Sequence, residues 1–568
     1  MTTDFFSLLN ESNSFKNEET GEITLIVPKL ESDKPLTINS NSKISSNCKT
    51  VINSPNLCVT SGSIIFKDIT FETPLTIKKC PEFSMMNCDI TNIKSDYSLS
   101  FEFCKNVELN QINITNNEID IAVFFQYSHA IANNLFIDGA TKVIIALIKE
   151  SSLNLCDSKL CNSMSKGINV LESEFEIHNC TISNTIYPAI YVWNSKGKIM
   201  NNHISNIKMN GITINNADSI EIYKNNITDV NGSAISIINE SKCEVHSNTI
   251  TKIGNNGIFV NNRSKINAHH NELSSFKYPA IAILTKSKAI ISENKISDIN
   301  SCGIRVINAK KVKIDKNEVK KIDECAISLL NTKNCIIKSN LISDCHIAAV
   351  EVYNQSKASI FDNDLSRLGE YAFKAYALGQ ITAKNNTITD VGKSMVNLIY
   401  KGGGEFINNK LEKCPQQKEG DTSSQYYFNG NGNFTGVTND ESKKTDDIQL
   451  EEKFIDNCNL CIKCKQRERK CFLLNCGHKI YCQECAEVAL RELQKCPLCR
   501  LPIVDINKGF VTKNETCDIC CDKKADCIVM PCCHIGYCHK CLNKWLQDNQ
   551  RCPYCQAEPV SYSRIQDI

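Results

Sequence analysis

The chain has 568 residues and a mass of 63.6 kDa, which is too long for one compact core, so we expect several units or one elongated array. Its 64 Lys and Arg residues balance 63 Asp and Glu residues, which argues against a nucleic-acid binder that works by phosphate neutralisation. No apolar run approaches the ~20 residues of a membrane-spanning helix, so we expect no membrane span.

The first 21 residues are expected to form an N-terminal cap. They contain no basic segment followed by a long apolar stretch, so we expect no signal peptide and a cytoplasmic protein, with the nucleus not excluded. Residues 3–16 include Phe5, Phe6 and Phe15 and predict a short helix over the open end of a β structure.

Residues 22–414 are expected to form one repetitive domain. From residue 202 onward an Asn-x-aliphatic triplet returns every 23 residues, at Asn202, Asn225, Asn248, Asn271, Asn294, Asn317, Asn340, Asn363, Asn386 and Asn409. Small–apolar pairs such as Gly211-Ile212 and Ala234-Ile235 keep the same interval. Between them, short stretches rich in Ile and Val alternate apolar and polar residues, which is typical of strands.

Short strands at a fixed interval, with no helical pattern between them, predict a solenoid. We expect an all-β, right-handed parallel β-helix with one coil per 23 residues, and irregular further coils between residues 22 and 200. Asn and Gly residues are expected at corners with left-handed backbone. A second Asn row predicts an internal amide ladder, formed by Asn216, Asn239, Asn262, Asn308, Asn331 and Asn354.

This domain resembles the pectate-lyase-like β-helix superfamily, which contains polysaccharide-cleaving enzymes and intracellular recognition domains. A glycan-active enzyme is the less favoured alternative, because the outward row between the paired apolar positions lacks the two carboxylates that glycoside cleavage needs. In that row, Phe259, Arg305, Glu351 and Lys374 are the predicted contacts for a protein substrate. The alternative is an ordinary solvated sheet.

His246 and His269 share the 23-residue interval and lie beside Tyr223 in the pattern. A stacked histidine pair is able to bind a metal ion, but no neighbouring residue completes a ligand set. We therefore interpret the pair as a polar outer ladder.

Residues 415–457 interrupt the repeat and are rich in Asn, Gly, Ser, Thr and charged residues, which predicts a flexible linker. About 40 such residues span a root-mean-square distance of roughly 35 Å. We expect this linker to allow wide movement of the domains that follow.

The last 118 residues contain 19 of the 33 cysteines, in two sets of metal-ligand spacing. Both sets read C-x2-C-x11-C-x-H-x3-C-x2-C-x10-C-x2-C, and each second-set residue lies 56 positions after its counterpart. Closed four-ligand sites predict four structural Zn²⁺ ions. The first set is Cys461, Cys464, Cys476, His478, Cys482, Cys485, Cys496 and Cys499; the second is Cys517, Cys520, Cys532, His534, Cys538, Cys541, Cys552 and Cys555.

This pattern is identified as that of the RING finger, with spacing most similar to the C-terminal RINGs of inhibitor-of-apoptosis proteins. We expect RING one at residues 458–505, an inter-RING linker at 506–516 and RING two at 517–568. The resemblance implies a cross-braced fold, in which the first and third ligand pairs share one zinc ion. The second and fourth pairs would then share the other.

The resemblance also implies a groove that binds a ubiquitin-conjugating enzyme. In RING two the matching residues are Ile519, Trp545 and Pro553, of the apolar kind that anchors interfaces. The alternative for Trp545 is simple packing. RING one has Lys463 and Ala489 at the positions of Ile519 and Trp545, so its groove is expected to be weaker.

The other functional residues that the RING resemblance implies are distributed between the two RINGs. Arg500 in RING one follows Cys499, where active members carry a linchpin cation, whereas RING two has the neutral Gln556 there. Phe510 lies where related RINGs carry a tail aromatic that supports ubiquitin. These positions suggest an intramolecular RING pseudo-dimer, in which RING two binds the enzyme and RING one donates Phe510.

The favoured interpretation is a RING-type ubiquitin-protein ligase with a non-covalent mechanism. Its β-helix would recruit a protein substrate, and its RINGs would orient a ubiquitin-charged conjugating enzyme for transfer to lysine. The alternative is a non-catalytic zinc-binding scaffold, and a glycan-active β-helix enzyme ranks third.

Overall fold

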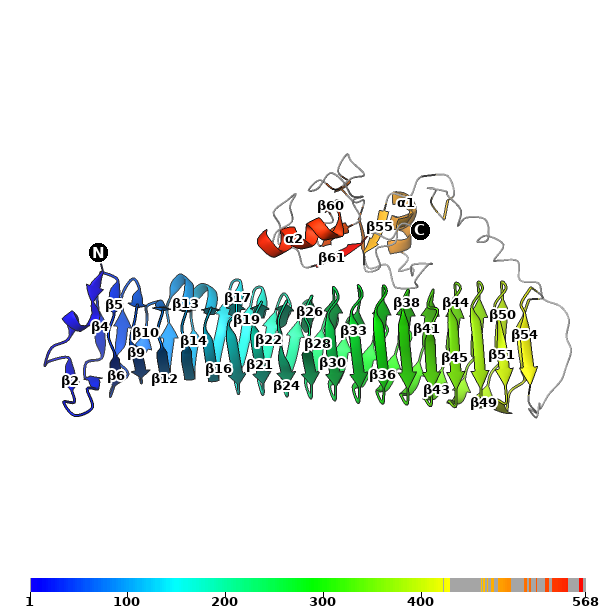
Figure 1. Ribbon diagram of the computed structural model, residues 1–568, viewed down its shortest axis with the longest axis horizontal. Coiled ribbons are helices and arrows are strands. Elements are labelled where there is room, and N and C mark those ends of the chain that lie inside the picture. Colours follow the sequence, from blue (N-terminus) through cyan, green and yellow to red (C-terminus); the bar gives the residue numbers. More distant parts are fainter. Residues whose placement is uncertain are drawn as a thin grey trace. The chain divides into compact units, whose positions relative to one another are not determined.

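The computed structural model divides the chain into two units, residues 1–437 and 438–568, which are considered separately. The structure describes residues 2–421 and 423–429 of the first unit. In the second unit it describes residues 461, 463–464, 467, 471–474, 479–491, 505–507, 510–511, 517, 527–530, 534–549 and 561–564. Within these ranges the first unit is a solenoid of mostly parallel strands, and the second contains short strands and two helices (Figure 1).

A short cap closes the N-terminal end of the solenoid. Strand β1 (Thr3–Asp4) pairs in parallel with β5 (Leu36–Ile38), and the 3₁₀ helix η1 (Phe5–Leu8) follows it. Phe5 is completely buried. The predicted capping helix is therefore present but only four residues long, and it ends where Leu9 takes an extended conformation (ψ 138°). The Asn13 side chain donates to the carbonyl of Leu8 (2.7 Å). Strand β2 (Ser14–Lys16) then pairs antiparallel with β3 (Ile23–Leu25).

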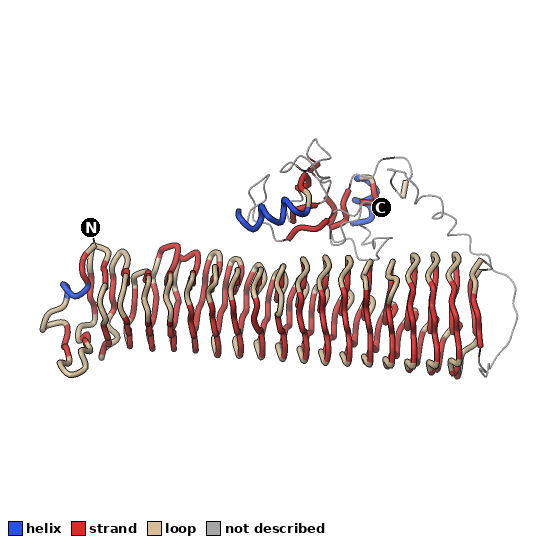
Figure 2. The backbone as a smooth tube through the Cα atoms, in the orientation of Figure 1, coloured by secondary structure: helices blue, strands red, loops and turns tan. Residues whose placement is uncertain are grey.

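The predicted β-helix is confirmed. Paired residues of neighbouring regular coils are 23 positions apart, which is the period of the sequence repeat. A typical coil contains β29 (Ile235–Ile238), β30 (Lys242–His246) and β31 (Thr249–Ile253). Each pairs in parallel with a strand one coil later, and each residue lies opposite the residue 23 positions on, as Ile235 does with Ile258. Figure 2 shows the resulting stack of coils.

The core of the solenoid is a set of stacked aliphatic columns. Ile212, Ile235, Ile258, Ile281 and Ile304 are all completely buried and follow one another in register. Burying one such side chain stabilises the fold by about 1.5–3 kcal/mol. Because neighbouring coils repeat the same contact, every coil depends on the coils on either side of it.

The internal amide ladder exists, but in a different Asn row from the one predicted. The predicted row lies at corners with positive φ, for example Asn216 (φ 49°) and Asn331 (φ 47°), and Asn331 is exposed. The buried ladder is the row of the Asn-x-aliphatic triplets, whose members from Asn202 to Asn386 are at most 2% exposed. Side chains of the predicted row do bond from coil to coil, as Asn262 does to Asn239 (2.6 Å). Its internal position was wrong, because a 23-residue period does not specify which corner residue turns inward.

The solenoid also continues beyond the predicted boundary at residue 414. Strand β53 (Gln416–Gly420) pairs with β50 (Ser394–Ile399), and β54 (Tyr426–Asn429) pairs with β51 (Gly403–Ile407). The rings of Phe406 and Phe428 stack with centroids 5.0 Å apart. Strand residues 416–420 read QQKEG and contain no aliphatic side chain, so their composition resembled that of a linker.

Of the four residues predicted to contact a protein substrate, two are not exposed to solvent. Arg305 and Glu351 are each 1% exposed, whereas Phe259 and the Lys374 side chain are partly exposed. An expectation of solvent-facing charges is therefore wrong for Arg305 and Glu351. A role of the four residues in binding a partner stays a prediction.

These buried charges are bonded along the same face. The Arg305 guanidinium donates to the Cys302 thiol (2.9 Å) and to the Glu324 carboxylate (3.2 Å). The Glu351 carboxylate accepts from the Ser328 hydroxyl (3.2 Å) and lies 3.6 Å from the Lys374 ammonium. Such pairing offsets part of the large cost of removing the charges from water.

In the second unit, two sets of elements repeat 56 residues apart. RING one contains β55 (Cys471–Leu474), β56 (Lys479–Tyr481), α1 (Gln483–Arg491) and β57 (Asp505–Asn507). RING two contains β59 (Cys527–Met530), β60 (His534–Tyr537), α2 (His539–Asn549) and β61 (Ser561–Arg564). Strand β58 (Phe510–Val511) lies between them and pairs with β60.

Candidate zinc centres and RING surface

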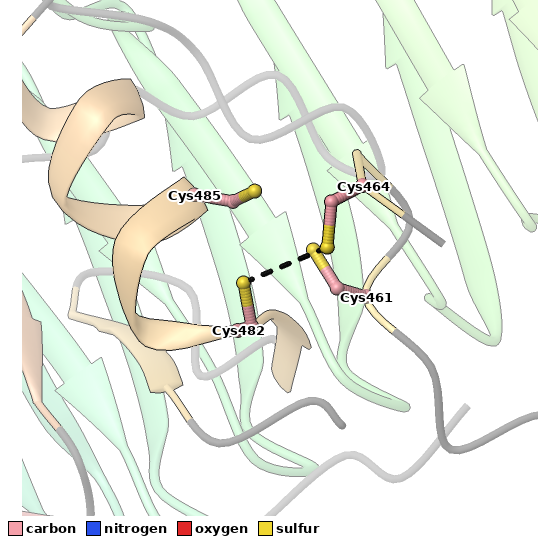
Figure 3. A group of neighbouring side chains, drawn as sticks. All are labelled: Cys461, Cys464, Cys482 and Cys485. Atoms are coloured by element: carbon pink, nitrogen blue, oxygen red, sulfur yellow. Dashed lines mark hydrogen bonds between the residues drawn. The ribbon is translucent and has the colours of Figure 1, made fainter. Parts of the chain in front are cut away.

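Four thiols converge on one point in RING one. The sulfur atoms of Cys461, Cys464, Cys482 and Cys485 all lie within 4.8 Å of one another and point toward a common centre (Figure 3). The Sγ atoms of Cys464 and Cys482 are 3.8 Å apart. Two thiolates on a tetrahedral zinc ion, each about 2.3 Å from the metal, lie about 3.8 Å apart. The four residues therefore fit a structural zinc ion.

Local backbone structure places these thiols. Cys482 directly precedes α1 and Cys485 lies in its first turn, where the amide of Ala486 donates to the carbonyl of Cys482 (3.0 Å). On the other side, the amide of Cys461 donates to the carbonyl of Arg467 (2.6 Å), which closes the loop that carries Cys464. A helix start and a tight loop thus each supply two ligands.

An ion pair joins the two halves of this centre. The guanidinium of Arg467 contacts the carboxylate of Glu484, which lies next to Cys485 on α1. Sequence reasoning missed this pair because no spacing rule connects a loop residue with a helix residue 17 positions away.

The electrostatics of the centre are also consistent with a bound cation. Burial, and then hydrogen bonds from the thiols of Cys482 and Cys461, raise the pKa of the Cys485 thiol. Crowded thiols cannot all ionise unless a positive charge compensates them, and a bound Zn²⁺ ion supplies that charge. The metal would have a structural role, because four protein ligands leave no position for a reacting water.

RING two repeats the arrangement. The sulfur atoms of Cys517, Cys538 and Cys541 lie within 4.8 Å of one another. The amide of Leu542 donates to the carbonyl of Cys538 (3.0 Å), as Ala486 does to Cys482. The fourth predicted ligand, Cys520, lies outside the described residues.

The described ligands therefore agree with the cross-braced pairing that the RING resemblance implied. For the second zinc ion of each RING, the backbone of His534 is described in β60. The other predicted ligands of these two ions lie outside the described residues; they are Cys476, His478, Cys496, Cys499, Cys532, Cys552 and Cys555.

Of the predicted conjugating-enzyme groove, Trp545 is described. It lies on α2 and is partly exposed, while its counterpart in RING one, Ala489, is completely buried on α1. Lys463, which replaces the groove isoleucine in RING one, is exposed. The other predicted groove and linchpin residues, Ile519, Pro553 and Arg500, lie outside the described residues.

The backbone around Phe510 is part of RING two's sheet. Strand β58 pairs in parallel with β60, with Phe510 opposite His534, and makes a four-stranded sheet in the order β58-β60-β59-β61 within the described residues. Among the described residues of RING one, the corresponding sheet has three strands, in the order β56-β55-β57. A segment that follows RING one in sequence is therefore joined to RING two.

Comparison with known proteins agrees with both architectures. The family model described as "Right handed beta helix region" matches residues 143–288, 233–388 and 279–439, which together cover more than half of the chain. The chain belongs to the right-handed β-helix family. The model described as "Zinc finger, C3HC4 type (RING finger)" matches residues 457–506 and 513–562, so this β-helix protein carries two RING fingers.

Curated relatives match only through a RING segment. RING finger protein 141 of Danio rerio is 42% identical over 48 residues, which are 8% of this chain and 21% of that protein. The Homo sapiens protein of the same name is 40% identical over 48 residues, or 8% and 20% of the two chains. This chain thus spans about a fifth of the length of the curated relatives it matches.

Solved structures resemble the chain only distantly. The cryo-EM structure of the Vag8–C1 inhibitor complex has a TM-score of 0.35 and 9% identity, and covers 75% of this chain and 98% of that one. A mutant of the periplasmic alginate epimerase AlgG has a TM-score of 0.27 and 9% identity, and covers 73% and 87%. These values are too low to support an argument about function. Among the described helices, none has both the length and the apolar character that crossing a membrane requires.

Proposed function

We propose that this protein is a RING-type ubiquitin-protein ligase. The observation that carries the proposal is the duplicated set of converging thiols, each built at the start of a helix, with a partly exposed Trp545 on the helix of RING two. Such a surface binds a charged conjugating enzyme, and catalysis consists of holding the ubiquitin thioester in a reactive orientation. The RINGs contribute no covalent step of their own.

In this proposal the β-helix recruits a protein substrate. Its support is the long stack of outward-facing rows, in which side chains 23 residues apart form continuous ladders that can match an extended partner. Transfer would go to a lysine of the recruited protein. A pull-down with the full chain, compared with one that lacks residues 22–429, tests the recruitment.

Autoubiquitination by the full-length chain, with activating enzyme, ATP and a panel of conjugating enzymes, tests the ligase activity. Substituting Trp545→Ala should weaken binding of the conjugating enzyme by about 2 kcal/mol, or roughly 30-fold, because a large apolar anchor is lost. The matched control is Lys544→Ala, an exposed neighbour on α2 that should retain activity. Equal activity of the two variants would contradict the proposed groove.

The alternative is a zinc-stabilised scaffold without ligase activity. The buried Ala489 and exposed Lys463 of RING one favour it, because this copy lacks the apolar anchors of RING two. If the protein holds its full zinc complement and transfers no ubiquitin with any conjugating enzyme, the scaffold alternative is supported.

A further inference from the structure

A second kind of metal-binding geometry lies on the solenoid. His269 ends β33 (Lys265–His269) and His270 follows it in the next corner, with φ 55°. Their rings are nearly perpendicular, at 82°, and their two Nδ1 atoms are 2.9 Å apart. Both nitrogen atoms thus face the same small volume at the surface.

The other nitrogen of each ring faces a carboxylate. The Nε2 atom of His269 is 3.0 Å from Glu244 Oε1, and the Nε2 atom of His270 is 2.7 Å from Glu293 Oε2. One carboxylate comes from the preceding coil and the other from the following coil. A carboxylate selects the tautomer with hydrogen on Nε2, so each Nδ1 atom presents a lone pair.

This arrangement leaves two lone pairs pointing at each other at 2.9 Å. With both ring hydrogens committed to carboxylates, neither Nδ1 atom has a proton to donate to the other. A cation bound by both nitrogen atoms would remove the repulsion between these lone pairs. Two nitrogen ligands at right angles, each about 2.05 Å from a metal ion, lie about 2.9 Å apart.

The surroundings hold this pair in place. The His269 ring stacks on His246, with centroids 4.9 Å apart, and His246 stacks in turn on Tyr223. Asn267 donates to Glu244 (3.2 Å), which holds this carboxylate in position behind the His269 ring. The ligands are thus oriented by partners in four successive coils.

We propose that His269 and His270 bind a divalent late transition-metal ion through their Nδ1 atoms. Glu244 and Glu293 would orient the rings from behind, as carboxylates commonly do for histidine ligands. The His270 side chain is 58% exposed, so water can complete the coordination. Imidazole ligands and a right-angle geometry suit Ni²⁺ or Cu²⁺, whereas Zn²⁺ prefers tetrahedral sites and Mg²⁺ and Ca²⁺ prefer oxygen ligands.

The test is isothermal titration calorimetry, in which NiCl₂ is added to the zinc-saturated full-length protein. The wild-type protein should take up one more Ni²⁺ ion than His270→Asn, a substitution that suits the left-handed backbone at this corner. Glu293→Gln should weaken this binding about 10- to 100-fold, because the ligand loses its orienting carboxylate. Binding by the RING cysteines is common to all variants and cancels in the comparison.

The control is His203→Asn, which removes an exposed histidine at the start of β25 (His203–Ile207) and should leave Ni²⁺ uptake unchanged. Thermal unfolding followed by circular dichroism checks that every variant is folded. Equal Ni²⁺ uptake by wild type and a folded His270→Asn variant would overturn the proposal, as would equal losses in His270→Asn and His203→Asn.

Discussion

The buried asparagines of the solenoid bond to backbone groups at one corner of each coil. The side-chain amide of Asn225 donates to the carbonyls of Ile199 (2.9 Å) and Tyr223 (3.0 Å). Its Oδ1 atom accepts from the backbone amide of Asn202 (3.0 Å), and its own backbone amide donates to Asn248 Oδ1 (3.0 Å). One side chain therefore joins three successive coils at a corner where water is excluded.

Substituting Asn225→Ala should lower the free energy of unfolding by about 3 kcal/mol or more, because it leaves several buried donors and acceptors unpaired at ~1–3 kcal/mol each. The chain supplies a matched control, Asn226→Ala, since Asn226 directly follows Asn225, is exposed and begins strand β28 (Asn226–Val230). Urea unfolding followed by circular dichroism measures both. Similar midpoints for the two variants would show that the ladder does not stabilise the solenoid.

The thiols of RING one show the same dependence on partners. Replacing Cys482 by Ser should release the zinc ion from this centre, because a hydroxyl is a far weaker ligand than a thiolate. Metal analysis of the purified protein should find one zinc ion fewer than in the wild type. The control is Cys335→Ser, which changes a buried cysteine of the solenoid and should leave the zinc content intact; an unchanged content in Cys482→Ser would contradict the site.

At the scale of elements, β58 is the feature that distinguishes the two RINGs. It is the fourth strand of RING two's sheet within the described residues, and it comes from the segment after RING one. This pairing joins the predicted inter-RING linker to RING two. The pseudo-dimer itself stays a prediction.

Substituting Phe510→Ala should slow ubiquitin discharge from the conjugating enzyme about tenfold, equivalent to ~1.4 kcal/mol of the barrier, because the aromatic support for ubiquitin is lost. Single-turnover discharge to free lysine measures the effect. Val511→Ala, in the same strand, is the control, and metal analysis should find all zinc ions in both variants. Unchanged discharge by Phe510→Ala would refute the proposed role.

At the scale of the whole molecule, the two units are stabilised by different forces. The solenoid has a continuous aliphatic core, whereas the zinc centres take the place of a core that modules of this size can hardly build. Removing the metal should therefore unfold one unit and spare the other.

Treatment with a strong zinc chelator should make the C-terminal unit sensitive to protease while the solenoid stays resistant. Limited proteolysis with mass spectrometry should then recover a fragment that ends near residue 429, and circular dichroism should retain most of its β signal. Adding zinc before protease is the control and should restore the full-length band. A C-terminal unit that resists protease after metal removal would contradict structural zinc.

Much of the architecture could be predicted from the sequence. A 23-residue interval is also the strand register, because identical positions stack directly on one another in a parallel solenoid. The zinc ligands could be predicted because a metal site of two Cys-x2-Cys pairs fixes the spacing as well as the residue type. Cys461, Cys464, Cys482 and Cys485 converge as that pattern requires.

Other features depended on side-chain direction, which a period does not specify. The same interval describes the buried Asn225 row and the partly exposed Asn216 row, and only the sign of φ at each corner separates them. Arg305 and Glu351 lie in an outward row and are nevertheless 1% exposed. The polar composition of the last coil did not predict strands β53 and β54. These strands are recognised by their pairing with β50 and β51.

By itself the sequence determined the solenoid, its coil length and the two zinc modules, because each follows from a strict spacing of residue types. Only the tertiary structure decided which asparagines turn inward, where the solenoid ends and how His269 meets His270 between two carboxylates. The physical reason is that these contacts join different coils and depend on local backbone angles. Neither is expressed in the order of residues along one repeat.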